Sequence, residues 1–596
     1  MPNLNVSELN VVTAVAGGFM VFFGIISVKI KHAWYLGEAL PAMLIGICMG
    51  PIAANFINAE GWGMKEEGQQ REITLGVTRV VICLQLVIAG YQLPAKYVWH
   101  RRFEVFMCLI PIMTLMWLLT TGCFLATIPK ITFLSGLAIA AAVTCTDPVL
   151  SQAVAKGPFA DKYVARPLRE IISAEACLND GFGFPFLMLA VYLMRHSQPI
   201  PFGYETTIDS HQSDTDHQLM IRSANVGRQG GGAGEALKNW FLECWLYYVI
   251  MSAVYGAFIG YTASKAMKFS LRKRWIDNES YVLFPTALGL FILGTAGAMG
   301  TNDLLACAAS GCALNWDGEF LAETEERHDE VNTCIDVILN FGGFMYIGTI
   351  IPWSEFHDPD GTGVTIWRLF LLGIMVLLLR RIPAILLLYR AMPKVITSWK
   401  EALFMGYFGP IGIGAVFYVE HTRHLMPEAG DGDDEEDNLI KALPATIYFL
   451  VVFSIVVHGL SIPLLNIIHQ NRGVKPIQDD AVSIRRRSVH MAMPPNAVVE
   501  DDENVIAYNR FWRPTSVYSG RPRSAVSEGL PFHENEMGES SSSANRTLNP
   551  SNDSNDSEDE FEKEKEKEKI PKRRHSEDDL EAARKRLERR VLRYDE

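Results

Sequence analysis

The sequence carries little charge for its length and has no excess of basic residues. Only 20% of its 596 residues are Asp, Glu, Lys or Arg, the formal net charge is −13 and the mean hydropathy is +0.12. This acidic balance argues against a nucleic-acid partner. All ten cysteines precede residue 471 and stand singly within apolar runs, which excludes a secreted disulfide framework. A positive mean hydropathy at this length also excludes an ordinary soluble enzyme.

The charge is divided unevenly along the chain. Residues 471–596 hold 23 Lys/Arg and 26 Asp/Glu, whereas the 470 residues before them hold only 31 and 41. We therefore predict a transmembrane domain over 1–470 and a cytoplasmic tail over 471–596. The tail has too few large apolar residues to form a core, so we expect it to be mostly disordered, with an amphipathic helix at 576–594. Its basic cluster at 485–487 suits anionic lipid, and regulatory proteins are the other expected partners.

The first 470 residues contain long apolar runs, which predict an all-α polytopic membrane protein. The loops after the first, third, fifth and seventh runs are basic, which places them in the cytoplasm, the N-terminus outside and the tail inside. The loop after the ninth run is acidic, which does not fit a cytoplasmic location, but acidic residues contribute little to this rule. Thirteen segments are predicted, at 9–29, 34–57, 73–92, 103–126, 131–154, 166–194, 239–264, 281–299, 301–316, 331–351, 364–390, 399–422 and 441–468.

The fifth segment contains a carboxylate beside a helix-breaking residue. Pro148 lacks a backbone N–H and disfavours helix at Asp147, so the helix should break there. Backbone groups freed at membrane depth are tolerated where they line a cavity or bind an ion. Thr144 and Thr146 add hydroxyl oxygens at the same place, which argues against a simple proline kink.

The sixth segment supplies further polar side chains. Glu175 and Asn179 are four residues apart and share one helical face, and Asp180 follows directly. A cluster of Asp147, Asp180, Thr146 and freed carbonyls offers oxygen ligands only, which suits a hard monovalent cation better than a transition metal. Because burial disfavours the charged form of a carboxylate, the same aspartates should also hold a proton. Competition between cation and proton for one site is the minimum chemistry of an exchanger.

The eleventh and twelfth segments provide a counter-ion and a second break. Arg380 and Arg381 lie in an apolar run, where Glu175 is the expected partner of one of them; the alternative is that both reach the membrane surface. Residues 406–414 are too rich in Gly and Pro for a continuous helix. Interrupted helices in the fifth and twelfth segments predict two inverted repeats, segments 1–6 and 8–13, with a site where the breaks cross.

Taken together, these motifs resemble those of the fungal plasma-membrane Na⁺/H⁺ antiporters of the monovalent cation/proton antiporter superfamily. The motifs are Thr-Asp-Pro at 146–148, Glu-x-x-x-Asn-Asp at 175–180, the arginine of segment 11 and the Gly-rich run at 406–414. The resemblance covers about residues 9–470. It implies a plasma-membrane homodimer that exchanges cytoplasmic Na⁺, Li⁺ or K⁺ for external protons in salt tolerance and pH homeostasis. No catalysed reaction and no cofactor are implied.

The resemblance also implies roles for individual residues. Asp180 would be the carboxylate that carries the cation or the proton, assisted by Asp147 and Thr146. Glu175 and Arg381 would form a structural ion pair beside the site, since Arg381 fits the family pattern better than its neighbour Arg380.

Two positions bear on the stoichiometry. Asn179 stands where electrogenic relatives have a second Asp, and in the family this Asn accompanies electroneutral exchange. Asp303 lies where the fungal members carry a functional acid, so it is a further candidate transport residue; its alternative role is to cap the helix of segment 9. At the level of function, the alternatives are a cation channel, a receptor-like membrane sensor or a carrier for another small ion.

Overall fold

The computed structural model describes residues 7–59, 62, 69–156, 158–197, 229–327 and 331–474, with three short strands between 481 and 509. The part before residue 475 is helical. Its first stretch comprises α1 (Glu8–Val28), η1 (Lys29–Ala33), α2 (Ala39–Met49), α3 (Gln69–Tyr91), α4 (Tyr97–His100), α5 (Arg102–Met107), η3 (Cys108–Ile112), α6 (Met113–Thr127), α7 (Phe133–Ala142), α8 (Pro148–Lys156), α9 (Pro158–Tyr163), α10 (Arg166–Phe182) and α11 (Phe184–Arg195).

A long helical run and a second series of helices follow. The run is formed by α13 (Gly232–Asn239), η4 (Trp240–Met251) and α14 (Ser252–Lys273). After it come α15 (Asn278–Ala298), α16 (Asp303–Leu314), α17 (Glu319–Glu326), α18 (Val331–Thr349), η5 (Trp353–Phe356), α19 (Ile366–Met375), η6 (Val376–Arg380), α20 (Ile382–Leu388), η7 (Tyr389–Ala391), α21 (Trp399–Tyr407), α22 (Ile413–Leu425) and α23 (Asp434–Asn471).

The lengths and apolar composition of the helices are those of a polytopic, all-helical membrane protein. Nine helical runs among the described residues are long and apolar enough to cross a bilayer, and α2, α7 and α16 are shorter apolar helices. Each of the thirteen predicted segments coincides with helix. Their lengths differ from prediction, however: α2 has only 11 residues, whereas the run from α13 to α14 has 42. The helix α23 has 38 residues and continues through Pro444 and Pro463.

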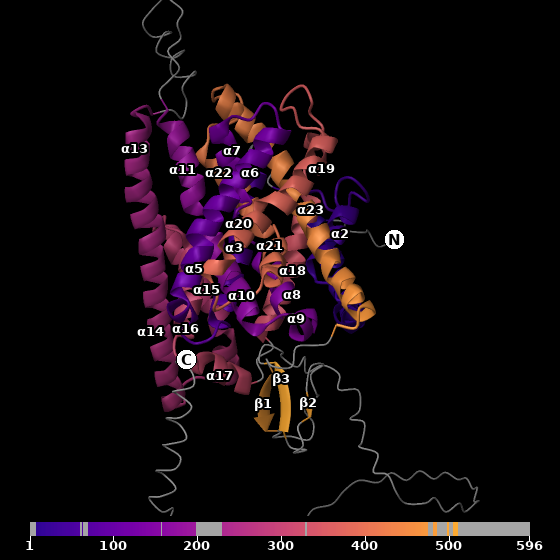
Figure 1. The fold of residues 1–596 in the computed structure, drawn as a ribbon, viewed down its shortest axis with the longest axis vertical. Helices are drawn as coiled ribbons and strands as arrows, with labels where there is room; N and C mark the ends of the chain where they lie inside the picture. The colour runs from indigo at the N-terminus through magenta and orange to yellow at the C-terminus, as the bar shows by residue number, and fades with distance from the viewer. Residues whose placement is uncertain are drawn as a thin grey trace, which may run out of the picture. The chain divides into compact units, whose positions relative to one another are not determined.

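Both predicted breaks are present, and they meet. The fifth segment is divided into α7 and α8 by Val143–Asp147, and the twelfth into α21 and α22 by Phe408–Gly412. α7 packs against α22, as Figure 1 shows at one end of the helical part. Where the breaks cross, the backbone N–H of Asp147 donates to the carbonyl of Pro410 at 2.9 Å. The crossing thus joins two segments that lie far apart in the sequence.

Close packing positions the helices around this crossing. α16 lies against both α3 and α14. Gly256 and Gly260, one turn apart on α14, lie so near α16 that an added methyl group would clash with the carbonyls of Ala306 and Ser310. These small residues let the two backbones approach, as in other membrane helix pairs. As a result, the N-terminal end of α16 is held beside α10, where Asp180 lies.

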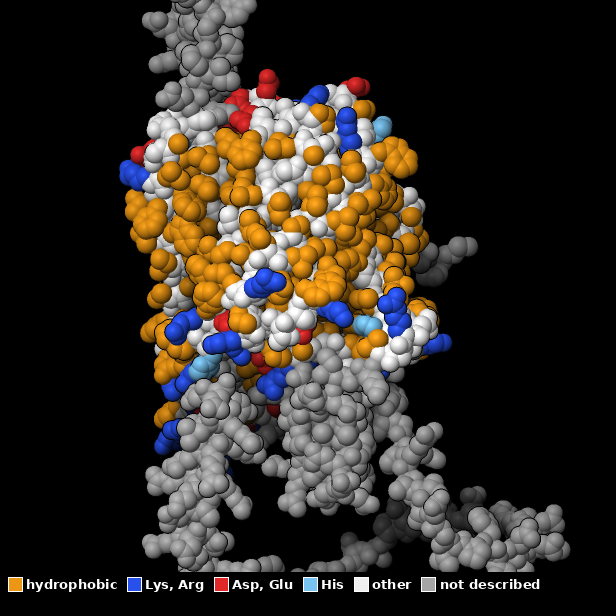
Figure 2. All heavy atoms as spheres, in the orientation of Figure 1, with side chains coloured by type: hydrophobic (Ala, Val, Ile, Leu, Met, Phe, Trp, Pro, Cys, Tyr) orange, Lys and Arg blue, Asp and Glu red, His pale blue; other side chains and the backbone are white. Residues whose placement is uncertain are grey.

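The surface of the helical part is divided by chemistry. Figure 2 shows a broad band of hydrophobic side chains, with most of the Lys and Arg of this view along its lower edge. In Figure 1 the same end carries α9, α17 and the C-terminal end of α14. The acidic loop after the ninth segment therefore lies at the same end as the basic loops after the fifth and seventh.

A small sheet follows the last helix. β1 (Ala481–Arg485), β3 (Val505–Asn509) and β2 (Val498–Val499) pair antiparallel in the order β1-β3-β2. The sequence analysis did not anticipate these strands. The helix predicted at 576–594 lies outside the described residues, so it stays a prediction.

Candidate functional site

Asp147 joins the two interrupted helices. Its Oδ1 accepts a hydrogen bond from the N–H of Leu150 at 2.9 Å, in the first turn of α8. Its Oδ2 accepts from the N–H of Ile413, the first residue of α22, at 3.0 Å. One buried carboxylate therefore caps two helix N-termini, one from each break, where the helix dipoles favour negative charge.

Arg380 lies at the C-terminal ends of the two helices that precede the breaks, α7 and α21. Its guanidinium donates to the carbonyl of Val143, at the end of α7, and to that of Gly409, just beyond α21. Arg380 is buried, so the interpretation that it reaches the membrane surface is wrong. A cation at two helix C-termini and an anion at two N-termini compensate the four partial charges that the breaks create.

Asp180 lies beside this crossing and has a carboxylate without hydrogen-bond donors. It is fully buried on α10, and neither carboxylate oxygen has a hydrogen-bond partner. Next to it, the Asn179 side-chain amide donates to the Thr146 hydroxyl at 2.6 Å, while Asn179 Oδ1 also lacks a partner. A buried carboxylate without a donor is costly, and either a proton or a bound cation would satisfy it.

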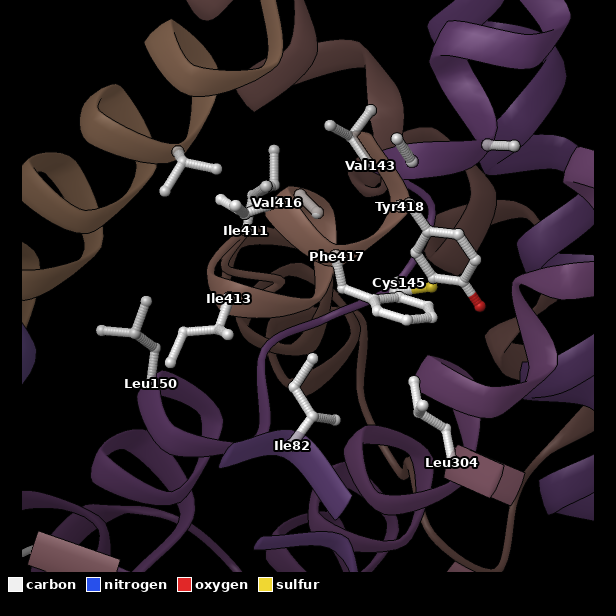
Figure 3. Close-up of a cluster of buried hydrophobic side chains, with 14 of the residues drawn as sticks. Ile82, Val143, Cys145, Leu150, Leu304, Ile411, Ile413, Val416, Phe417 and Tyr418 are labelled. Carbon is white, nitrogen blue, oxygen red and sulfur yellow. The ribbon is translucent and has the colours of Figure 1, made fainter. Parts of the chain in front are cut away.

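The end of the second break and the start of α22 lie next to both Asp147 and Asp180. A methyl group at Gly412 would clash with the Asp147 carboxylate, and one at Gly414 would lie 3.0 Å from Asp180 Oδ1. Both carboxylates therefore contact the start of α22. Figure 3 shows the apolar surroundings of this region, with Cys145 from the first break and Tyr418 of α22 near each other. The Tyr418 hydroxyl donates to the backbone carbonyl of Asp180, which ties α22 to α10.

The close approach at Gly412 leads to a prediction. In Gly412→Ala the new methyl group displaces the Asp147 carboxylate from the Ile413 N–H, a charge-assisted bond worth about 1.5–3 kcal/mol. We expect a lower thermal unfolding midpoint for the variant in detergent solution. Gly122→Ala on α6 is the matched control, because nothing lies within 4 Å of its added carbon. Equal behaviour of the two variants would contradict the prediction.

Glu175 and Arg381 form the predicted ion pair. Arg381 Nη1 and Nη2 donate to the two carboxylate oxygens at 2.6 and 2.7 Å, and both side chains are buried. Arg381 Nε also donates to the Met405 carbonyl of α21 at 3.0 Å. Together these bonds fix α10 to the segment 11 helix and to α21. Glu175 lies about one and a half turns before Asp180 along α10.

Asp303 is bound by Arg79. Arg79 Nε and Nη2 donate to Asp303 Oδ2 at 2.9 and 2.6 Å, and the N–H of Leu304 donates to Oδ1 at 3.0 Å. The cap of α16 is the neighbouring Asn302, whose Oδ1 accepts from the N–H of Leu305. The alternative role of Asp303 as the helix cap is therefore wrong. Asn302 also donates to the carbonyl of Gly181 at 2.6 Å, which places the start of α16 directly beside the Asp180 turn.

Two residues of α23 belong to the site region but carried no role in the sequence analysis. The N–H of Ile411 donates to Ser454 Oγ at 2.7 Å, and His458 Nε2 donates to the Tyr407 carbonyl at 3.0 Å. Ser454 Oγ and the Ser454 carbonyl oxygen lie 3.1 and 2.9 Å from His458 Nδ1, so the imidazole is also tied to its own helix. These side chains replace helix hydrogen bonds lost at the second break. Their spacing of four residues within an apolar segment was the available signal.

The donor set fits a monovalent cation as cargo. Among the residues that the structure describes, no group of three His, Cys, Asp or Glu could hold a resident metal ion. The open acceptors are oxygens, two from Asp180 and one from Asn179. Thr146 lies within this group, whereas the Thr144 hydroxyl donates to the carbonyl of Ala140. Hard oxygen donors with limited charge suit an alkali cation.

Comparison with known proteins identifies the family of this chain. Residues 18–467 match the family model described as "Sodium/hydrogen exchanger, transmembrane". A "Na(+)/H(+) antiporter" of Saccharomyces cerevisiae and "Na(+)/H(+) antiporter 2" of Zygosaccharomyces rouxii are each 34% identical over 78% of this chain, which covers 44% and 53% of their lengths. The chain thus spans about half the length of these relatives. A "Na(+)/H(+) antiporter" of Schizosaccharomyces pombe is 32% identical, and there the match covers 91% of the relative.

A solved structure shares the fold. The sodium proton antiporter MjNhaP1 from Methanocaldococcus jannaschii at pH 8 superposes with a TM-score of 0.51 and 14% sequence identity, over 76% of this chain and 100% of that one. At this identity the likeness concerns the fold alone. The family model and the curated relatives together show that the chain belongs to the sodium/hydrogen exchanger family, whose members are transporters and not enzymes.

Proposed function

We propose that this protein is a secondary active antiporter that exchanges cytoplasmic Na⁺, and also Li⁺ and K⁺, for external protons. The observation that carries the proposal is the fully buried Asp180 carboxylate, whose two oxygens have no hydrogen-bond donor. In the exchange step the protonated Asp180 releases its proton as the cation binds the carboxylate, and the reverse occurs at the other side. One group therefore holds either ion but not both.

Cation binding would use the open oxygens beside the crossing. Asp180 supplies the charge, and Asn179 Oδ1 and the Thr146 hydroxyl lie next to it. Asp147 contributes by fixing the starts of α8 and α22, since both of its oxygens already accept a backbone N–H. Glu175 and Arg381 hold α10 in place.

We further propose a one-for-one, electroneutral exchange. Asp180 has both oxygens open, Asn179 is uncharged, and Asp303 is bound by Arg79 and by the N–H of Leu304. We assign no ion-binding step to Asp303 for that reason. One exchangeable carboxylate carries one positive charge in each direction, as Na⁺ or as H⁺.

The topology belongs to the same proposal. Thirteen membrane spans in two inverted repeats, an external N-terminus and a cytoplasmic tail over 471–596 agree with the basic edge in Figure 2. Alternating access then moves the helices around the crossing past the rest of the protein. A plasma-membrane homodimer is the assembly that we propose, with anionic lipid and regulatory proteins as partners of the tail.

Flux measurements on the reconstituted protein test the proposal. We expect an imposed pH gradient to drive Na⁺, Li⁺ and K⁺ uptake into proteoliposomes, with rates that saturate as the cation concentration rises. The rate should not change when a voltage is imposed. A linear concentration dependence would indicate a channel, voltage-driven flux would contradict the stoichiometry, and absence of pH-driven alkali-cation flux would overturn the proposed function.

A further inference from the structure

A groove of about 390 Å³ opens on the protein surface where the fourth and eleventh segments come together. Its walls are Trp99, His100, Arg102 and Phe103 on one side, and Pro393 and Lys394 on the other. The first group belongs to α4 and the start of α5, and the second to the turn that follows η7. The groove is remote in the sequence from the breaks and from every motif that pointed to ion exchange.

The groove presents cations together with aromatic rings. The Arg102 guanidinium lies over the Trp99 ring, 5.4 Å from its centroid, and Lys394 is exposed on the opposite wall. The acidic residue of the lining, Glu104, is buried, and its Oε1 lies 4.0 Å from Arg101 Nη1. A guanidinium stacked on a ring keeps its N–H edges free for a phosphate. The open part of the groove therefore favours an anion.

The location of the groove identifies the kind of anion. Trp99 and Phe103 are 59% and 51% exposed, and Phe103 begins, while Trp99 just precedes, a helical run that is apolar and long enough to span a bilayer. Aromatic side chains at such a place lie at the level of lipid headgroups. In the proposed orientation, the loops after the third and eleventh segments, which form this groove, face the cytoplasm. The cytoplasmic leaflet is the one that carries anionic phospholipids.

We propose that this groove binds the headgroup of an anionic phospholipid. The phosphate lies between Arg102 and Lys394 with His100 beside it, and Trp99 and Phe103 contact the glycerol and the first acyl carbons. The lipid thereby connects the start of α5 to the turn before α21. Since η3, which continues α5, packs against α20, the headgroup adds a second connection between segments that the protein already joins there. The proposal uses the orientation given under Proposed function but not the transport activity.

Lipid retention by the full chain tests the site. The protein is reconstituted in phosphatidylcholine vesicles that contain phosphatidylserine, re-extracted in mild detergent, and the phospholipids that remain bound are counted by native mass spectrometry. We expect Arg102→Gln/Lys394→Gln to retain one phosphatidylserine fewer per protomer than the unchanged protein. Phosphatidylserine should also raise the thermal unfolding midpoint of the unchanged protein but not that of the variant.

A second basic pair at a helix end serves as the matched control. Lys265 lies over the Tyr261 ring at 5.1 Å and Arg272 lies in the last turn of α14, so Lys265→Gln/Arg272→Gln removes the same charge from another cation–aromatic pair. Retention should not change in this control, and the tail cluster at 485–487 is common to all three proteins. Equal loss from both pairs, unchanged retention in the first variant, or displacement of the lipid by inorganic phosphate would each overturn the proposal.

The same measurements separate the site from the proposed function. If lipid retention depends on Arg102 and Lys394 while no pH-driven flux is seen, the groove stands and the transport proposal fails. If pH-driven flux is present and lipid retention does not depend on Arg102 and Lys394, the transport proposal stands and the lipid site fails.

Discussion

Asp180→Asn should abolish pH-driven cation exchange while leaving the protein folded. The amide can neither take up a proton in the relevant pH range nor supply the negative charge that balances a bound cation. Because the Asp180 oxygens have no hydrogen-bond donors, the substitution removes a buried charge without breaking a bond. The unfolding midpoint should therefore be unchanged or raised, and flux should fall to that of protein-free vesicles.

A nearby buried substitution controls for disturbance of the region. The Thr144 hydroxyl donates to the Ala140 carbonyl, one helical turn earlier, and does not face the Asp180 oxygens as a donor. Thr144→Val should therefore keep most of the flux. Substantial exchange by Asp180→Asn would exclude Asp180 as the carrier of the two ions. Loss of flux accompanied by a strongly lowered midpoint would show that its role is structural.

Arg381→Met is expected to destabilise the protein by about 3–5 kcal/mol, since it leaves the buried Glu175 carboxylate without its partner. Glu175→Leu should have a similar effect from the other side. The double variant Glu175→Leu/Arg381→Met removes both charges, and replacing a complete buried pair by apolar residues is often neutral. Thermal or denaturant unfolding in detergent should therefore show both single variants weakened and the double variant largely recovered.

An exposed ion pair gives the comparison. Lys441 and Asp437 are one helical turn apart on α23, with side chains 50% and 20% exposed, and such pairs contribute about 0–1 kcal/mol. Lys441→Ala should accordingly leave the unfolding midpoint almost unchanged. If Arg381→Met is equally mild, or if the double variant is as unstable as the singles, Glu175 and Arg381 do not act as a pair.

Much of the site followed from local sequence chemistry. Pro148 removes an N–H and restricts the residue before it, so the break at Asp147 is a local consequence of the sequence. The second break is similarly local, because 406–414 is rich in Gly and Pro. The pairing of Glu175 with Arg381 was predictable because an intramembrane arginine needs a counter-ion. In all three cases a few neighbouring residues carry the information.

The remaining contacts depend on how distant segments meet. Arg380 was treated only as an alternative to Arg381, since nothing local indicates that its guanidinium spans the ends of α7 and α21. Asp303 was recognised as a candidate, but nothing local indicates that it pairs with Arg79, 224 residues away. The bonds from Ser454 and His458 to the second break likewise require the position of α23. Side-chain partners of this kind are fixed by tertiary packing and leave only a weak trace in the sequence.

The double cap on Asp147 has a consequence for biosynthesis. Its second donor, the Ile413 N–H, lies 266 residues further along the chain. At a synthesis rate of about 5–20 residues per second, the first break waits tens of seconds before that donor is made. During this interval Asp147 Oδ1 can accept from the nearby Leu150 N–H, but Oδ2 lacks the donor that it has in the folded protein. The centre of the site is therefore completed only after nearly all membrane helices have been synthesised, and a chain released before residue 413 lacks half of it.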